Sequence, residues 1–378
     1  MVVIQPLDRR RPAHRRRFIR LPFRLYRRDP HWVAPLDTAQ HAVLSDREPF
    51  FAHGEAQLFI AVRDGRDRGR IAAIENRRHN RMWDDRVGFF GFFECEDDTE
   101  AAGALLAASE DWLRGRGLAV MRGPVNLSTN HTLGLLVAGE PGPPMIDMTY
   151  NPSYYKRLLV RHDLVKAMDL LAHIMDVTGP ATVARLEKMA RRTESRGNVT
   201  ERCIDMKYFD RDLAVIKQLY NAAREKNWGF VPLTDKEIDH IARDLKTVID
   251  PGLVRFVFVD GKPAGFIAVV VNINEILIML KGRLLPFGVF LLLAGRPRIK
   301  SLRLMLMGVV REMRRRGLET LLYYRTMRYA IGRGYRVCEN SWLLESNEPV
   351  LRASEFMGGR EYRRYRLYER PIAEARHD

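Results

Sequence analysis

The chain has 378 residues, of which 46% are hydrophobic and 29% charged, so it is long enough for two folded domains and lacks a disordered composition. Its three cysteines (Cys95, Cys203 and Cys338) are too few and too scattered for a disulfide framework or a zinc site. This predicts a reducing, cytoplasmic setting and no metal. The formal net charge of +16 favours anionic partners: nucleic acid, an anionic lipid surface or a phosphate-bearing molecule. Neither a signal peptide nor a membrane-spanning run is recognisable.

The two halves of the sequence carry the same signals in the same order. "DPHWVAPL" (29–36) recurs as "EKNWGFVPL" (225–233), and "LFIAVRDGRDRGRIAAI" (58–74) recurs as "VRFVFVDGKPAGFIAVV" (254–270), both at an offset of 196 residues. In the second pair, two β-branched and aromatic runs flank Asp-Gly, which predicts a β-hairpin in each half. Later, "WLRGRGL" (112–118) recurs as "YAIGRGY" (329–335) at an offset of 217 residues. The repeat predicts an α/β (α+β) fold of two similar domains, each a mixed twisted sheet flanked by helices.

The repeat also predicts where the domains begin and end. We expect an N-terminal domain over residues 1–176, a linker helix over 177–200 and a C-terminal domain over 201–378. The change of offset places an insertion in the second half, at residues 281–300, which contains the apolar run "LLPFGVFLLLA" (284–294). Its basic flanks suit the surface of an anionic bilayer, although a wall for an acyl chain or an ordinary buried helix is also consistent. The flanking cations are Lys281, Arg283, Arg296, Arg298 and Lys300.

The segment "GVVREMRRRGLETLL" (308–322) joins a predicted buried strand (303–310) to a predicted helix (318–334). A helix N-terminus exposes unpaired N–H groups and a partial positive charge, so the turn, with Gly317 and its arginines, suits a phosphate. Solvated arginines at a helix start are the alternative. At an offset of 217, the first half has "ECEDDTE" (94–100) at this place, whose charge would repel a phosphate. We therefore predict a polyphosphate site in the C-terminal half alone.

This turn resembles the signature of the GNAT acyltransferase superfamily, Arg/Gln-x-x-Gly-x-Gly/Ala. Arg314 takes the first position, Gly317 the central glycine and Glu319 the last small residue. The resemblance implies that main-chain amides here bind the pyrophosphate of coenzyme A, and that Asn347 begins a later helix. Ser354 stands where many members have an acid-donating tyrosine. The cofactor-binding residues implied are Gly308, Val309, Arg311, Arg314, Arg315, Arg316, Gly317, Leu318 and Asn347.

Nearly the whole chain resembles the tandem-GNAT proteins of the YghO type. The resemblance is carried by "RLPFRLYRRDPHWVAPL", "HNRMWDDRVGFFGFFE", "RGPVNLSTN", "YNPSYYKRLL" and "NSWLLESN". That group includes the bacterial ceramide synthases, which join a fatty acyl group to the amine of a sphingoid base. The resemblance implies two tandem GNAT-like domains and an N-acyltransferase that uses long-chain acyl-CoA and a sphingoid base. With the basic, apolar insertion, it also implies peripheral association with an anionic inner membrane and no nucleic-acid partner.

Transfer of an acyl group from a thioester to an amine needs a base, donors for the oxyanion and often an acid for the thiolate. Glu339, in "VCENSW", could be the base, although an exposed strand carboxylate or an ion pair is equally open. His79 has a suitable ordinary pKa, and Glu94 could bind or deprotonate an amine. Tyr155, near a predicted helix start, is the fourth catalytic candidate, although core packing is the commoner role of a tyrosine.

The predicted acceptor site consists of polar and aromatic residues that follow strands. "NLSTN" (126–130) offers hydrogen-bonding side chains for a polar headgroup, and a turn or a helix cap explains it equally well. The predicted substrate-binding residues are Asn126, Ser128, Asn130, Tyr150, Ser341 and Trp342.

Two other functions remain open on the sequence alone. One is a FemABX-like transferase that uses aminoacyl-tRNA, whose phosphates would match the basic charge, although no RNA-reading module is visible. The other is a non-catalytic basic protein that docks on a membrane or on nucleic acid. It leaves the difference in charge between the two turns unexplained.

Overall fold

The structure, a computed structural model, describes residues 1–373 except 225–226, 247–248 and 284–287. The start of "EKNWGFVPL" and the first four residues of "LLPFGVFLLLA" therefore lie outside the described residues. Tertiary contacts divide the chain into two compact units, and each is discontinuous in sequence. Unit 1 comprises Met1–Leu170, Asn274–Ala294 and Arg363–Asp378, and unit 2 comprises Leu171–Ile273 and Gly295–Tyr362.

The predicted domain boundaries follow the repeat along the chain, whereas the units follow strand pairing. Residues 363–371 of the last strand, β13, belong to unit 1 and pair with strands of that unit. The segment 274–294, which contains most of the predicted insertion, also belongs to unit 1. The predicted linker, 177–200, contains helix α6, which packs against helix α11 inside unit 2.

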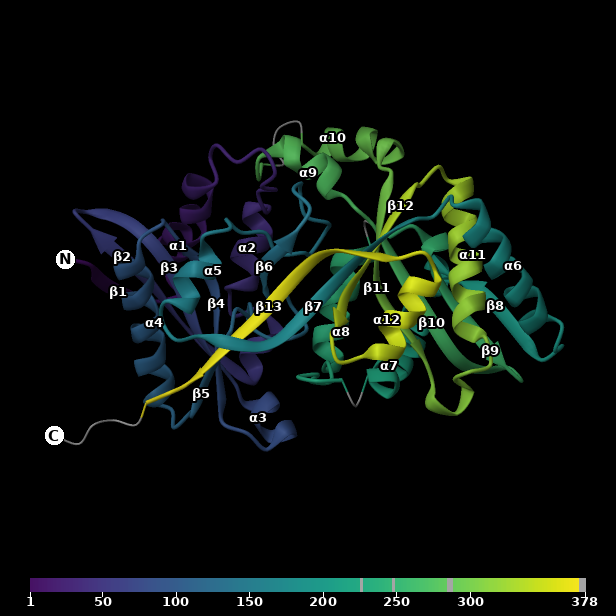
Figure 1. Cartoon of the computed structure of the whole chain (residues 1–378), viewed down its shortest axis with the longest axis horizontal. Helices are drawn as coiled ribbons and strands as arrows, with labels where there is room; N and C mark the ends of the chain where they lie inside the picture. The colour runs from purple at the N-terminus through teal and green to yellow at the C-terminus, as the bar shows by residue number, and fades with distance from the viewer. Residues whose placement is uncertain (225–226, 247–248, 284–287, 374–378) are drawn as a thin grey trace. The chain divides into compact units, whose positions relative to one another are not determined.

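Unit 1 contains a mixed sheet with the strand order β1-β2-β3-β4-β5-β13, and β6 also pairs with β13 (Figure 1). Only β4 and β5 are parallel among the described pairs of this unit. Successive strand residues point to opposite faces, so alternate residues of β2, β3 and β4 pack against α4, and Phe92 of β4 meets Phe18 of α1. The elements are β1 (Val3–Leu7), α1 (Pro12–Leu25), α2 (Asp37–Val43), the 3₁₀ helix η1 (Pro49–Ala52), β2 (Gly54–Arg63), β3 (Arg66–Asn76), α3 (Arg77–Trp83), β4 (Val87–Cys95), α4 (Thr99–Arg114), β5 (Val120–Gly123), β6 (Leu135–Gly139), α5 (Tyr155–Val160), β7 (Val165–Asp176), which continues into unit 2, α9 (Asn274–Leu280) and α10 (Gly288–Gly295).

Unit 2 has the strand order β7-β12-β11-β10-β9-β8. Helices α7 and α8 bury apolar side chains against β9 and β10, while α11 packs against α6 and the same strands. The 3₁₀ helices are η2 (Met206–Tyr208), η3 (Pro251–Leu253), η4 (Arg296–Arg298) and η5 (Arg311–Met313). The other elements are α6 (Pro180–Glu194), β8 (Val199–Cys203), α7 (Phe209–Arg224), α8 (Asp235–Lys246), β9 (Val254–Val259), β10 (Lys262–Val271), β11 (Ser301–Val309), α11 (Leu318–Gly332), β12 (Val337–Leu344), α12 (Glu348–Phe356) and β13 (Arg360–Pro371), which ends in unit 1.

The two predicted hairpins are confirmed. Asp64 and Gly65 join β2 to β3, with φ angles of 51° and 72°, and Asp260 and Gly261 join β9 to β10, with φ angles of 50° and 75°. Positive φ at both central residues is the pattern of a type I′ turn, whose twist matches that of the flanking strands. The repeat therefore preserves the local chemistry of this turn in both units.

The alignment at a single offset of 217 is wrong at the arginine turn. β4 and β11 correspond at an offset of 214 at both ends, whereas the helices that follow them begin at Thr99 and Leu318. Three residues (96–98) connect β4 to α4, while eight residues (310–317) connect β11 to α11. Unit 1 therefore has a turn that is five residues shorter, and most of the arginine turn has no counterpart there.

Candidate active site

The arginine turn of unit 2, residues 310–317, lies between the end of β11 and the start of α11. Gly317 is the N-cap of α11, with a left-handed backbone (φ 83°), and it has no side chain to accept a bond from the first N–H groups of the helix. Arg311, Arg314, Arg315 and Arg316 are all exposed around this helix start. N–H groups and guanidinium groups that converge in this way suit an anion with several oxygens, such as a diphosphate.

Hydrogen bonds to main-chain oxygens hold the shape of this turn. Arg314 donates from Nε to the carbonyl of Val309 at 3.2 Å, and Arg196 donates to the carbonyl of Arg316 at 2.6 Å. In the part of the chain that the structure describes, neither Arg311 nor Arg315 forms an ion pair with a carboxylate. Among the described residues, the charges of Arg311 and Arg315 are therefore not neutralised by a carboxylate.

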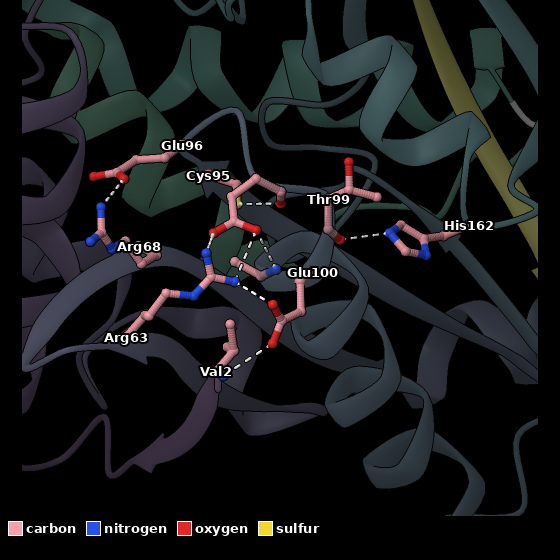
Figure 2. Close-up of polar contacts among 10 residues, drawn as sticks. Val2, Arg63, Arg68, Cys95, Glu96, Thr99, Glu100 and His162 are labelled. Atoms are coloured by element: carbon pink, nitrogen blue, oxygen red, sulfur yellow. Dashed lines mark hydrogen bonds and ion pairs between the residues drawn. The ribbon is translucent and has the colours of Figure 1, made fainter.

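The acidic turn of unit 1 is neutralised from within that unit (Figure 2). Arg68 bonds to Glu96 at 2.7 Å, and Arg63 pairs with Asp98 at 2.7 Å. Asp98 also caps α4, because its carboxylate accepts a hydrogen bond from the N–H of Ala101 at 3.1 Å. A carboxylate thus occupies the helix start that would bind a phosphate. Further pairs are Arg24–Glu96, Arg63–Glu100 and Arg157–Asp97.

Unit 1 also fills the space beside β4 with its own main chain. The parallel ladder between β4 and β5 covers only Val87–Phe89 of β4. Beyond it, Val125 donates its N–H to the carbonyl of Phe90 at 2.8 Å, and the side chain of Asn126 accepts from the N–H of Phe92 at 2.7 Å. A Cβ on Gly91 would lie 2.1 Å from the carbonyl oxygen of Val125, so glycine is required there. This edge of β4 is therefore occupied.

The corresponding stretch of β11 in unit 2 is partly exposed. The ladder between β11 and β12 covers Ser301–Leu304 and Val337–Asn340. β11 continues to Val309, and its residues 305–308 remain partly exposed next to the arginine turn. Gly308 and Val309, two of the predicted cofactor-binding residues, thus lie where the strand enters the turn. Leu318 is fully buried, so its N–H rather than its side chain faces the turn. Asn347 is the N-cap of α12 and is partly exposed.

Glu339 is part of a buried polar cluster in unit 2. It lies on β12 opposite Arg303 of β11 and is fully buried. Ser341 donates its hydroxyl to one carboxylate oxygen at 2.5 Å, and Tyr362 donates its hydroxyl to the other. The Nε of Arg303 donates to Ser341 at 3.0 Å and lies 3.7 Å from the Glu339 carboxylate, with its guanidinium above the ring of Trp342. Buried carboxylates with two hydroxyl donors are suited to receiving a proton through one of those hydroxyls.

Ser354 of α12 lies in a second buried cluster of unit 2. Its hydroxyl accepts a hydrogen bond from Asn340 at 3.0 Å and lies 3.1 Å from Nδ1 of His173. Burial lowers the pKa of His173, so its imidazole is neutral near neutral pH. The serine that stands in place of a tyrosine is therefore a hydrogen-bonded member of the core.

Two of the catalytic candidates in unit 1 are in contact with each other. Glu94, on β4, accepts hydrogen bonds from Tyr26 at 2.7 Å and from Tyr155 at 2.8 Å, and Arg70 lies 3.8 Å away. Burial raises the pKa of Glu94, although Arg70 and the two hydroxyl groups oppose the shift. His79 lies elsewhere, on α3, where it is buried 3.4 Å from Asp85. Burial is also the main cause that lowers its pKa.

The predicted acceptor residues of unit 1 make local hydrogen bonds. The side-chain oxygen of Asn126 accepts a hydrogen bond from the N–H of Phe92 on β4, and its amide donates to the hydroxyl of Thr132, at 2.7 Å in each case. Ser128 lies 2.8 Å from His131 and accepts from the N–H of Asn130, which closes the "NLSTN" turn. Tyr150 donates its hydroxyl to Asp29 at 2.8 Å, at the start of the segment "DPHWVAPL" (29–36). Their arrangement is that of a hydrogen-bonded turn, and a role in acceptor binding stays a prediction.

Sequence reasoning missed Tyr362 and Arg303. An arginine inside the apolar run "LRLMLM" was a usable signal, because a charge in a buried strand needs a buried partner. Tyr362 carried no such signal, since its partner lies 23 positions away on another strand. The structure thus assembles Glu339, Ser341 and Trp342, predicted for two different roles, into one cluster with these two residues.

Two named proteins resemble the chain over nearly its full length. The bacterial ceramide synthase of Caulobacter vibrioides is 38% identical over 372 residues, which cover 96% of each chain. Protein YghO of Escherichia coli is 32% identical over 364 residues, which cover 94% of this chain and 92% of YghO. No protein-family model matches the chain.

Solved structures with the same fold are themselves GNAT proteins. A tandem GNAT protein from the clavulanic acid biosynthesis pathway matches with a TM-score of 0.60 over 99% of both chains, at 12% sequence identity. A GCN5-related N-acetyltransferase from Sphaerobacter thermophilus matches with a TM-score of 0.51 over 98% of this chain and 96% of that one, at 15% identity. The predicted fold class is thereby confirmed. Together with the identity to the two full-length relatives, this likeness shows that the chain belongs to the tandem-GNAT acyltransferases of the YghO type.

Proposed function

We propose that the protein transfers a long-chain fatty acyl group from acyl-CoA to the amine of a sphingoid base. The observation that carries the donor half is the arginine turn of unit 2, where exposed guanidinium groups surround a helix start capped by glycine. The acceptor half is supported by the relative at 38% identity that is named a bacterial ceramide synthase. Because the chain belongs to an acyltransferase family, the non-catalytic docking protein is set aside.

The donor is bound in this proposal by its phosphates. The N–H groups of residues 317–319 and the guanidinium groups of Arg311, Arg315 and Arg316 contact the diphosphate of coenzyme A, while Arg314 also holds the main chain of the turn. The rest of the donor follows β11, along the partly exposed residues 305–308. Asn347, at the start of α12, completes the predicted set. Coenzyme A supplies the thioester; the protein binds and orients it.

The chemistry requires the amine to lose one proton and the thiolate to gain one. The amine nitrogen attacks the thioester carbonyl carbon, the carbonyl oxygen takes up negative charge, and collapse of this intermediate breaks the carbon–sulfur bond. Glu339 is buried, so it does not reach the amine directly. We assign Tyr362 as the relay: its hydroxyl takes the proton from nitrogen as it passes its own proton to Glu339. The departing thiolate takes up a proton from solvent to give free thiol, and Glu339 returns the proton it received to solvent through Tyr362, so no net proton is gained or lost.

The candidates in unit 1 stay predictions for the acceptor side. Glu94, whose carboxylate accepts hydrogen bonds from Tyr155 and Tyr26, is the candidate for holding an ammonium group, because an arriving cation would offset the burial that raises its pKa. His79, Asn126, Ser128, Asn130 and Tyr150 are the others. The structure leaves His79 the weakest of them, because it is buried against Trp83 and Phe89 on a separate helix.

The test is direct. The protein is incubated with a long-chain acyl-CoA and a sphingoid base, and amide product and free thiol are measured together. Equal amounts of both support the proposal. Product formed only with aminoacyl-tRNA would support the FemABX-like function instead, and free thiol without amide would show that the acceptor is wrong.

The donor site is tested by charge reversal in the turn. We expect Arg314→Glu with Arg316→Glu to raise the KM for acyl-CoA about a hundredfold, because two charge-assisted contacts to phosphate become repulsive. The matched control is Arg191→Glu with Arg352→Glu, which changes the net charge equally on two other exposed helices of unit 2. If both pairs raise KM equally, the effect is one of overall charge and the turn is not the site.

A further inference from the structure

Unit 1 exposes a patch of apolar side chains that the proposed reaction does not use. It lies on α9 and α10, the two short helices drawn in green in Figure 1. Met279 is 61% exposed, Phe290 71% and Leu291 41%. Ordinary surfaces carry single exposed apolar residues, and large ones gathered on one element mark an interaction site. We name these three residues the apolar patch.

Helix α9, which carries Met279, is anchored on its other side. In α9, Ile276, Leu277 and Leu280 are buried while Met279 is exposed, so the helix has one face in the core and one outside. Asn274 donates its amide to the carbonyl of Pro144 at 2.9 Å, which ties the start of α9 to unit 1.

The turn that follows α9 is also tied to unit 1. Asp37 donates its N–H to the carbonyl of Gly282 at 3.5 Å, and a Cβ on Gly282 would lie 2.6 Å from the ring of Phe23. Helix α9 and the turn after it are therefore anchored on unit 1, and a Cβ on Gly288, at the start of α10, would lie 3.5 Å from Leu280 of α9.

Basic residues accompany the apolar patch. Lys281 and Arg283, on the turn after α9, are both exposed. Arg27 and Arg28, just after the end of α1, are exposed too, and the ring of Phe23 of that helix meets the turn at Gly282. Within the described ranges, none of the four is paired with a carboxylate. Four free cations beside exposed apolar side chains match a surface that is negatively charged outside and apolar beneath.

We propose that this surface docks unit 1 on a bilayer that contains anionic phospholipid. Phe290, Leu291 and Met279 insert at the boundary between headgroups and acyl chains, and the four cations contact lipid phosphates. A second copy of the chain fits this surface less well. A twofold interface brings the same patch of each copy together, so the four unpaired cations would face their own equivalents. The inference stands whether or not the acceptor is a sphingoid base.

The experiment is co-sedimentation of the full chain with vesicles of phosphatidylcholine, alone or mixed with phosphatidylglycerol. We expect binding to the mixed vesicles that weakens as salt rises. Phe290→Ser with Leu291→Ser should weaken it about tenfold or more, through the loss of buried apolar area. The control, Val160→Ser with Val165→Ser, removes two other exposed apolar side chains of unit 1 and should bind like wild type.

A second pair of variants tests the charges. Lys281→Glu with Arg283→Glu should lose the preference for phosphatidylglycerol, whereas Lys156→Glu with Arg161→Glu, on another exposed part of unit 1, should keep most of it. Absence of wild-type binding to mixed vesicles would overturn the proposal, as would unchanged binding by the Phe290 and Leu291 variant. If the wild-type protein binds no vesicles but forms a dimer, and the Phe290 and Leu291 variant does not dimerise, the surface is occupied by a second copy of the chain. Amide formation with detergent-dispersed substrates tests the reaction separately.

Discussion

Gly317 and Thr193 lie so close that a Cβ on the glycine would be 2.4 Å from the threonine Oγ1. Thr193 belongs to α6, and its hydroxyl also lies 3.5 Å from the Gly317 carbonyl. The start of α11 is thus held against α6, with the glycine at a left-handed φ of 83°. Both the angle and the contact exclude a side chain at this position.

Gly317→Ala is therefore expected to have two separable effects. The left-handed backbone costs about 1 kcal/mol with alanine, and the contact with Thr193 adds to this and shifts the turn. We expect the KM for acyl-CoA to rise about tenfold. The control is Gly334→Ala, which has the same φ of 83° but whose nearest neighbour, Lys300 Nζ, would be 3.7 Å from the new Cβ. It should lose about 1 kcal/mol in urea unfolding, less than Gly317→Ala loses, and keep the donor KM.

The relay through Tyr362 is tested by a double-mutant cycle. Glu339→Gln and Tyr362→Phe should each lower kcat about a hundredfold while the donor KM stays unchanged, because both interrupt the same proton path. The double variant should be no slower than the slower single variant. Multiplied effects would show that the two residues act independently, and the relay would then be wrong.

The short turn of unit 1 is expected to be structural. Asp98→Ala removes both the cap of α4 and the pair with Arg63, and should lower the free energy of unfolding by about 1–2 kcal/mol. Asp98→Asn keeps a capping oxygen and should cost less than half as much. Neither change should alter the donor KM. A raised KM in either variant would place donor binding in unit 1.

Asp212 gives unit 2 a dependence on pH. Burial alone would raise its pKa, but paired hydrogen bonds from Arg202 (2.6 and 2.7 Å), with others from Asp205 and Arg211, outweigh burial and hold the pKa at about 2. A depressed carboxyl pKa stabilises the fold at pH values above its unfolded value of 3.8, and this contribution is lost as pH falls towards the folded value. The contribution of the Asp212 carboxylate to the free energy of unfolding is about 2 kcal/mol.

Asp212→Asn should therefore destabilise the protein by about 2 kcal/mol near pH 7, and by clearly less near pH 3. Urea unfolding followed at both pH values measures the difference. Glu187→Gln removes an exposed pair with Arg191 and should change stability little at either pH. A difference for Asp212→Asn that does not shrink on acidification would mean that packing, and not charge, explains the loss.

Local signals in the sequence were sufficient for the hairpins and for the arginine turn. Asp-Gly between alternating apolar runs specifies a turn within four residues, and the glycine before an apolar helical pattern marks the start of α11. Both depend on chemistry between near neighbours, which is why they could be read directly.

Features that depend on distant partners could not be predicted. The acidic turn was expected to repel phosphate through its charge, yet Arg24, Arg63 and Arg68 neutralise it from elements far away in sequence. Aligning the two halves at a constant offset missed the shorter connection before α4. Extra residues inside a turn do not change the hydrophobic periodicity of the strand and helix on either side, so the sequence pattern does not reveal them. The cluster around Glu339 likewise depends on the pairing of β11 with β12 and on a side chain from β13, which no local pattern encodes.

Strand β13 has a consequence for how the chain is made. Its residues 363–371 pair with β5 and β6, so the sheet of unit 1 gains this strand only after the residues of unit 2 have been translated. Until β13 is made, β5 lacks this partner strand. Nascent chains are thus expected to need protection from aggregation, and loss of β13 should destabilise the first half of the protein as well as the second.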